Sequence, residues 1–65
     1  MLKEIFKSGI TTAYEDERGY IFSIQEDNSR RRYYKVTARR PGELGKTIAT
    51  RCTWETAQAL IRDYQ

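Results

Sequence analysis

Cationic and aromatic side chains are concentrated in the middle of the chain, where residues 30–35 read Arg-Arg-Arg-Tyr-Tyr-Lys. The alternating polarity of residues 32–40 predicts a strand with Tyr33, Lys35, Thr37 and Arg39 on its polar face. Arg and Lys bind phosphates, and hydrogen-bonding side chains beside them reach base edges in a groove. The predicted nucleic-acid-binding residues are Arg30, Arg31, Arg32, Tyr33, Lys35, Thr37, Arg39, Arg40 and Lys46.

The net charge of the 65-residue chain is unevenly distributed. Residues 1–29 carry three positive and six negative charges, a net charge of −3. Residues 30–65 carry nine positive and three negative charges, a net charge of +6, and eight of these cations lie between Arg30 and Arg51. This asymmetry indicates an anionic partner. The alternative is a solvated charged face that only keeps the sheet soluble.

The residue types argue against an enzyme and against a metal or cofactor site. The chain has no His, and its single Cys, Cys52, cannot form an internal disulfide or supply a four-ligand zinc site. Without a neighbouring base, Cys52 is predicted to be a small packed side chain between strand and helix rather than a nucleophile. We therefore predict no catalytic residues, no metal and no cofactor.

Two further patterns have structural explanations. Gly45-Lys46-Thr47 resembles the end of a phosphate-binding P-loop, but position 40 is Arg instead of Gly, and 48–50 favour a strand over the required helix. Carboxylates cluster at 15–17 and 26–27, and both clusters are predicted to lie in solvated turns rather than to form a buried acid/base pair.

Periodicity predicts the elements that position the basic segment. Residues 20–25 and 32–40 alternate as strands, and 46–51 form a short third strand. Thr53 is a good N-cap for a helix over 53–64, in which an apolar stripe is predicted to be core. The members of this stripe are Trp54, Ala57, Leu60, Ile61 and Tyr64. Residues 1–8 are predicted to form a short amphipathic helix, followed by a lead-in strand at 10–14.

These elements predict an α+β fold with a three- or four-stranded antiparallel sheet on one C-terminal helix. The length allows a single small domain, comprising an N-terminal helix or arm (1–18), the sheet (19–51) and the helix (53–64). If the helix covers one face of the sheet, the face that carries Tyr33, Lys35, Thr37 and Arg39 is left open.

This pattern resembles the arm-type, AP2-like DNA-binding domain at the N-terminus of phage and transposon tyrosine integrases. The resemblance covers residues 19–65 and is carried by 19–24, 32–40, 46–49 and the helix entry Thr53-x-x-x-Ala57. It implies a three-stranded sheet, backed by one helix, whose open face lies in the DNA major groove. It implies no recombinase activity, because the catalytic residues of that reaction are not present.

We therefore expect a non-enzymatic module that binds duplex DNA, or RNA if Tyr33 stacks on an unpaired base. The alternative is a small phage- or plasmid-type inhibitor or interaction protein that binds an acidic protein surface through the same face. A monomer or a weak homodimer is compatible with either. The single Cys and the absence of a run of about 20 apolar residues predict a cytoplasmic protein without a membrane partner.

Overall fold

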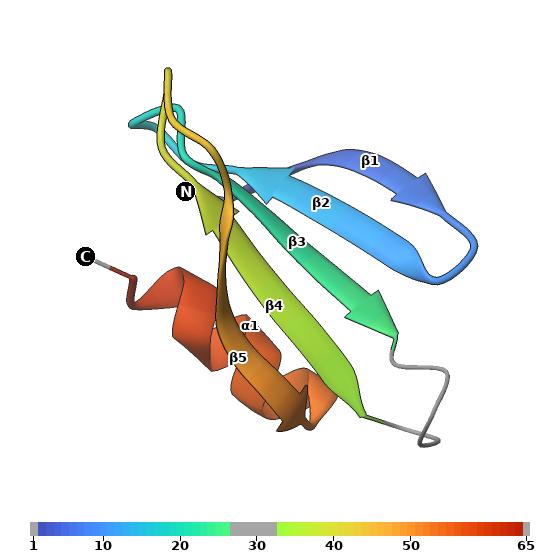
Figure 1. Ribbon diagram of the computed structural model, residues 1–65. Coiled ribbons are helices and arrows are strands. Elements are labelled where there is room, and N and C mark those ends of the chain that lie inside the picture. Colours follow the sequence, from blue (N-terminus) through green and yellow to red (C-terminus); the bar gives the residue numbers. More distant parts are fainter. Residues whose placement is uncertain (1, 27–32, 65) are drawn as a thin grey trace.

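The fold is a five-stranded antiparallel sheet with one helix on one of its faces (Figure 1). The computed structural model describes residues 2–26 and 33–64. The strands lie side by side in chain order, and the elements are β1 (Lys3–Ser8), β2 (Thr11–Glu15), β3 (Ile21–Glu26), β4 (Tyr34–Arg39), β5 (Lys46–Cys52) and α1 (Trp54–Arg62). The prediction of an α+β fold with an antiparallel sheet and a C-terminal helix is confirmed.

The prediction of an N-terminal helix is wrong, because residues 3–8 form the edge strand β1. A two-residue turn connects β1 to β2, and Gly9 in this turn has a φ of 53°. Glycine adopts this left-handed conformation at little cost, so the chain can reverse tightly here. An isolated helix of under ten residues is marginal, whereas pairing with β2 satisfies the same backbone groups. The sheet consequently has five strands instead of three or four.

The core lies between α1 and the central strands. Phe22 and Ile24 of β3 pair with Ala38 and Val36 of β4, and all four side chains are buried. Ala57 and Ile61 of α1 complete this cluster from above the sheet. The alternation predicted for 20–25 is therefore confirmed, and so is that for the described part of 32–40, because every second side chain points toward the helix.

The helix begins as predicted, but its apolar stripe is only partly buried. The Thr53 hydroxyl accepts a hydrogen bond from the Thr56 amide at 3.2 Å, which confirms the N-cap. Ala57 and Ile61 are buried, whereas Trp54 and Leu60 are each 37% exposed. The prediction that these two residues are core is wrong, because only the centre of this nine-residue helix faces the sheet. Trp54 instead meets the ring of Tyr34 edge-on, with centroids 5.3 Å apart.

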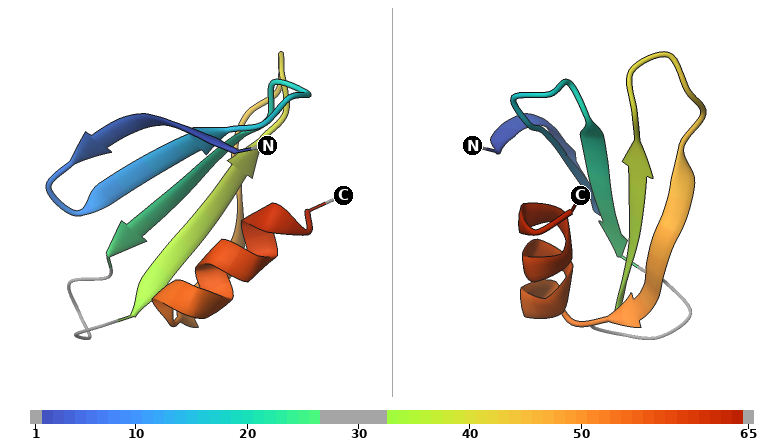
Figure 2. Two further views of the ribbon diagram at one scale, coloured as in Figure 1. Left: turned by 180° about the vertical axis from the view of Figure 1, so that it is seen from behind. Right: turned by 90° about the vertical axis from the view of Figure 1, so that its left-hand side faces the viewer.

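Helix α1 lies over β4 and β5, and the β1–β2 hairpin extends beyond it, as the view from behind shows (Figure 2). One face of the sheet is thus open across all five strands. The other face is covered at β4 and β5 and less covered at the hairpin. Within the described ranges, no helix has the length and apolar character needed to cross a membrane.

Candidate nucleic-acid interface

The open face of the sheet carries three of the predicted binding residues on β4. Val36 and Ala38 are buried against α1, so the alternating side chains of Lys35, Thr37 and Arg39 point to the opposite side. Lys35 and Arg39 are exposed and Thr37 is half-buried. Helix α1 packs on the other side of β4, against Val36 and Ala38. The predicted orientation of this part of the basic segment is confirmed.

Strand register arranges the open face in three rows that run across the sheet. The middle row has small and hydroxyl side chains together with Phe6, and it consists of Phe6, Ala13, Ser23, Thr37 and Thr47. One flanking row consists of Ser8, Thr11, Gln25 and Lys35. The other consists of Lys3, Glu15, Ile21 and Arg39. Cations therefore lie on both sides of a row of uncharged side chains.

The remaining predicted binding residues lie in other parts of the chain. Lys46 pairs with Ala38, whose side chain points toward the core, and lines a hollow together with Arg40 and Tyr64. The guanidinium carbon of Arg40 is 5.7 Å from the centroid of the Tyr20 ring. Lys46 and Arg40 thus lie at the loop end of the helix side, away from Lys35 and Arg39, and their part in binding nucleic acid stays a prediction. Tyr33 is 39% exposed, and Arg30, Arg31 and Arg32 lie outside the described residues.

Sequence reasoning missed the contribution of the β1–β2 hairpin to the open face. Lys3, Ser8 and Thr11 extend the flanking rows, and Gln25 lies directly beside Lys35. The alternation of residues 11–15 was the available signal, but it had to be combined with the correct assignment of β1. Glu15, predicted in a turn, is the one acidic side chain among these three rows, and Lys3 is its register partner.

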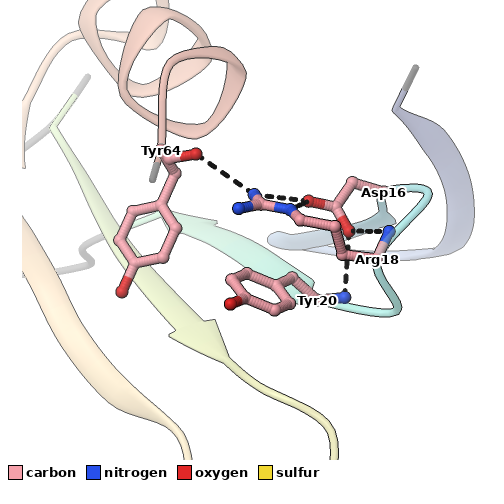
Figure 3. A network of polar contacts seen from close by, with 4 residues as sticks. All are labelled: Asp16, Arg18, Tyr20 and Tyr64. Atoms are coloured by element: carbon pink, nitrogen blue, oxygen red, sulfur yellow. Dashed lines mark hydrogen bonds and ion pairs between the residues drawn. The ribbon is translucent and has the colours of Figure 1, made fainter.

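Asp16 organises the turn between β2 and β3 (Figure 3). Its Oδ1 accepts hydrogen bonds from the amides of Arg18 and Tyr20, at 2.9 and 3.0 Å. Its Oδ2 accepts from Nε and Nη2 of Arg18, at 2.9 and 2.7 Å. Arg18 also donates from Nη2 to the carbonyl oxygen of Tyr64 at 3.1 Å, and its guanidinium lies 4.0 Å from the centroid of the Tyr20 ring. This carboxylate therefore has a structural role and connects the turn to the end of α1.

We expect Asp16→Ala to lower the free energy of unfolding by about 1–2 kcal/mol at pH 7, because it removes several charge-assisted hydrogen bonds. Desolvation raises the pKa of Asp16, but hydrogen bonds from Arg18 and the Tyr20 amide, with the Arg18 charge, outweigh it and lower the pKa overall. The stabilisation is therefore present above the unfolded-state pKa and lost as the pH falls through the lowered folded-state pKa.

Urea unfolding of the wild type and Asp16→Ala at pH 7 and at pH 2 tests this prediction. The difference between the two proteins should be clear at pH 7 and much smaller at pH 2. Glu43→Ala is the matched control, since Glu43 lies exposed in the loop between β4 and β5. An effect of Glu43→Ala equal to that of Asp16→Ala would contradict the assigned role.

Two other sequence patterns have structural roles here. The Sγ of Cys52 is half-buried and lies 3.4 Å from the carbonyl oxygen of Tyr34, so the thiol packs between β5 and β4. Residues 46–52, which follow Gly45, form β5 instead of the helix that a P-loop requires. Among the described residues, no group of His, Cys, Asp and Glu side chains is arranged to hold a metal ion.

Comparisons of the chain with family models, with curated proteins and with solved structures find no match. The class that the fold and the candidate site define is therefore a small α+β protein with an open, partly basic sheet face. The resemblance to integrase arm domains stays a prediction.

Proposed function

We propose that the protein is a non-enzymatic module that binds duplex DNA by placing the open sheet face in the major groove. The observation that carries this proposal is the arrangement of Lys35 and Arg39 on either side of Thr37 on a face that nothing in the described structure covers. Cations in these positions bind phosphates, and the uncharged row between them meets base edges. This assignment implies a cytoplasmic protein, and the resemblance to integrase arm domains links it to phages or other mobile elements.

The spacing of these side chains favours duplex DNA over duplex RNA. Arg39 is four positions after Lys35 on the same strand, which places the two residues about 13 Å apart. The major groove of B-DNA is about 12 Å wide and admits a β-structure, so the two cations can approach phosphates on its two sides. The major groove of A-form RNA is too deep and narrow for side chains to read. The middle row supplies Ser23, Thr37 and Thr47 as hydroxyl donors and acceptors.

A protein partner on the same face is the second candidate function. Phe6, on the open face, is 52% exposed, and the neighbouring Ile5 is 44% exposed. Exposed aromatic and other apolar side chains such as these are typical of protein interfaces. In this alternative, the protein is a small phage- or plasmid-type inhibitor or interaction protein, and Lys35 and Arg39 pair with acidic residues of its target.

Titration of a fluorescently labelled random-sequence duplex at about 0.1 M salt, followed by anisotropy, tests the first proposal. Lys35→Ala and Arg39→Ala should each weaken binding about fivefold to tenfold, because each removes one phosphate contact. Arg62→Ala is the matched control, since Arg62 lies in the last turn of α1, in the layer away from the open face. Equal losses in all three variants would show that binding follows overall charge instead of the open face.

A further inference from the structure

A hollow of about 300 Å³ lies on the helix side of the sheet. Figure 2 shows that the β1–β2 hairpin extends past α1 on this side. Strands β1, β2, β3 and β4 and the first turn of α1 all contribute to its lining. The hollow is on the face opposite Lys35 and Arg39, because its residues Tyr14 and Ile24 are on the side of the sheet that carries the core. The proposed DNA-binding face does not use it.

Three aromatic side chains line this hollow. Tyr34 and Trp54 meet edge-on at an interplanar angle of 66°, and Trp54 remains 37% exposed. The hydroxyl of Tyr14 accepts a hydrogen bond from Nε2 of Gln58 at 3.1 Å, which ties β2 to α1. The ring contact holds Tyr34 of β4 against Trp54 of α1, and the hydrogen bond holds Tyr14 of β2 beside α1. The exposed part of the Trp54 ring is therefore available to a ligand in the hollow.

Two carboxylates line the same hollow. Glu4 comes from β1 and Glu26 from the end of β3, where its amide donates to the carbonyl oxygen of Ile10 at 2.8 Å. Lys7 also lines the hollow, but within residues 2–26 and 33–64 no ion pair joins it to either glutamate. Among the described lining residues, these two carboxylates and the Lys7 ammonium give a net charge of −1, in contrast to the positive charge of the open face.

We propose that this hollow binds an arginine side chain presented by an extended segment of a partner protein. A guanidinium stacks on aromatic faces, with tryptophan the most favourable, and also forms hydrogen bonds with carboxylates. The hollow brings both kinds of group together, and its volume is at the lower end of ligand pockets, which suits one side chain. Glu4 and Glu26 would repel a phosphate, so the ligand differs in charge from that of the open face. The protein would then connect an anionic ligand on one face with a cationic segment on the other.

Trp54 is the only tryptophan in the chain, so its fluorescence reports directly on the hollow. The probe is a capped Gly-Arg-Gly peptide, and the control ligand is Gly-citrulline-Gly, which has nearly the same shape without the charge. We expect a saturable change in Trp54 emission with the arginine peptide only. Glu4→Gln and Glu26→Gln should each weaken this binding about threefold to fivefold, as expected for partly exposed ion pairs. Glu43→Gln, outside the hollow, should bind as the wild type does.

Amide chemical shifts of ¹⁵N-labelled protein provide a second measurement that does not depend on the emission of Trp54. The arginine peptide should shift amides of β1, the end of β3 and the start of α1. Equal effects of the citrulline peptide, no shifts in this region, or binding that both glutamate variants retain would overturn the proposal.

Two further experiments test whether peptide binding is independent of DNA binding and whether a second copy of the chain occupies the hollow. Lys35→Ala should leave peptide binding unchanged, so a failure to bind DNA and a failure to bind arginine are distinguishable. Sedimentation equilibrium tests whether a second copy of the chain fills the hollow. A dimer that excess arginine peptide dissociates would make a second copy the occupant and would overturn the assignment to a partner protein.

Discussion

Phe22→Ala is expected to unfold most of the protein at 25 °C. Phe22 has no exposed surface, and its ring packs edge-on against Tyr64, with centroids 5.4 Å apart. Removing a buried phenylalanine side chain costs about 3–5 kcal/mol, from lost burial and from the cavity left behind. A chain of about 60 residues buries a smaller fraction of its surface than larger domains do and is marginally stable. The substitution therefore removes most of the free energy of unfolding.

The chain contains a matched control for this prediction. Phe6 is the other phenylalanine, and it is 52% exposed on the edge strand β1. Phe6→Ala should change the free energy of unfolding by less than about 1 kcal/mol, as substitutions outside the core usually do. Urea unfolding followed by circular dichroism measures both variants. If the two substitutions cost the same, the helix does not pack on the face of the sheet that carries Phe22.

The sequence predicts those parts of the fold in which local pattern and tertiary environment agree. Alternation at 20–25 and 32–40 matches β3 and β4 because these central strands have one covered face and one open face. Thr53 marks the start of α1 because capping depends only on the next few residues. None of residues 3–8 is buried, so no buried face imposes a period on them, and only pairing with β2 determines their conformation.

The candidate site is predictable to the same extent. The face of Lys35, Thr37 and Arg39 follows from alternation along β4, which pairs with β3 without a break in register. The side of the sheet on which Lys46 lies does not follow from alternation, because the pairing of β5 with β4 has two register shifts. Next to one of them Arg51 has a φ of 56°, a conformation uncommon for residues other than glycine. Bulges of this kind reverse the side to which later residues point, and polarity patterns do not show them.

The hollow with its aromatic and acidic lining could not be predicted from the sequence, for a different reason. Its lining comes from four strands and the helix, so no single segment carries its signature. Trp54 fitted the apolar stripe of a helix, and the stripe alone does not show how far the helix extends over the sheet. Only the off-centre position of α1 leaves this side chain half-exposed beside Tyr34.

The affinity for duplex DNA is expected to fall steeply with salt concentration. Lys3, Lys35 and Arg39 are the described cations in the rows of the open face, and at least one of the arginines at 30–32 is expected to join them. Each neutralised phosphate adds about 0.9 to the slope of log affinity against log salt, so four contacts give a slope of about −4. A threefold rise in salt should therefore weaken binding by about fiftyfold to a hundredfold.

Single substitutions assign this slope to individual side chains. Lys35→Ala and Arg39→Ala should each reduce the magnitude of the slope by about one, if each contacts a phosphate. Arg40 is the sharpest control, because it follows Arg39 directly in the chain but lies near the Tyr20 ring, toward the helix side. Arg40→Ala should therefore leave the slope unchanged, although it removes the same charge. A slope that falls equally in all three variants would mean that the open face does not direct binding. No detectable binding even at low salt, where electrostatic attraction is strongest, would overturn the DNA proposal and favour a protein partner for this face.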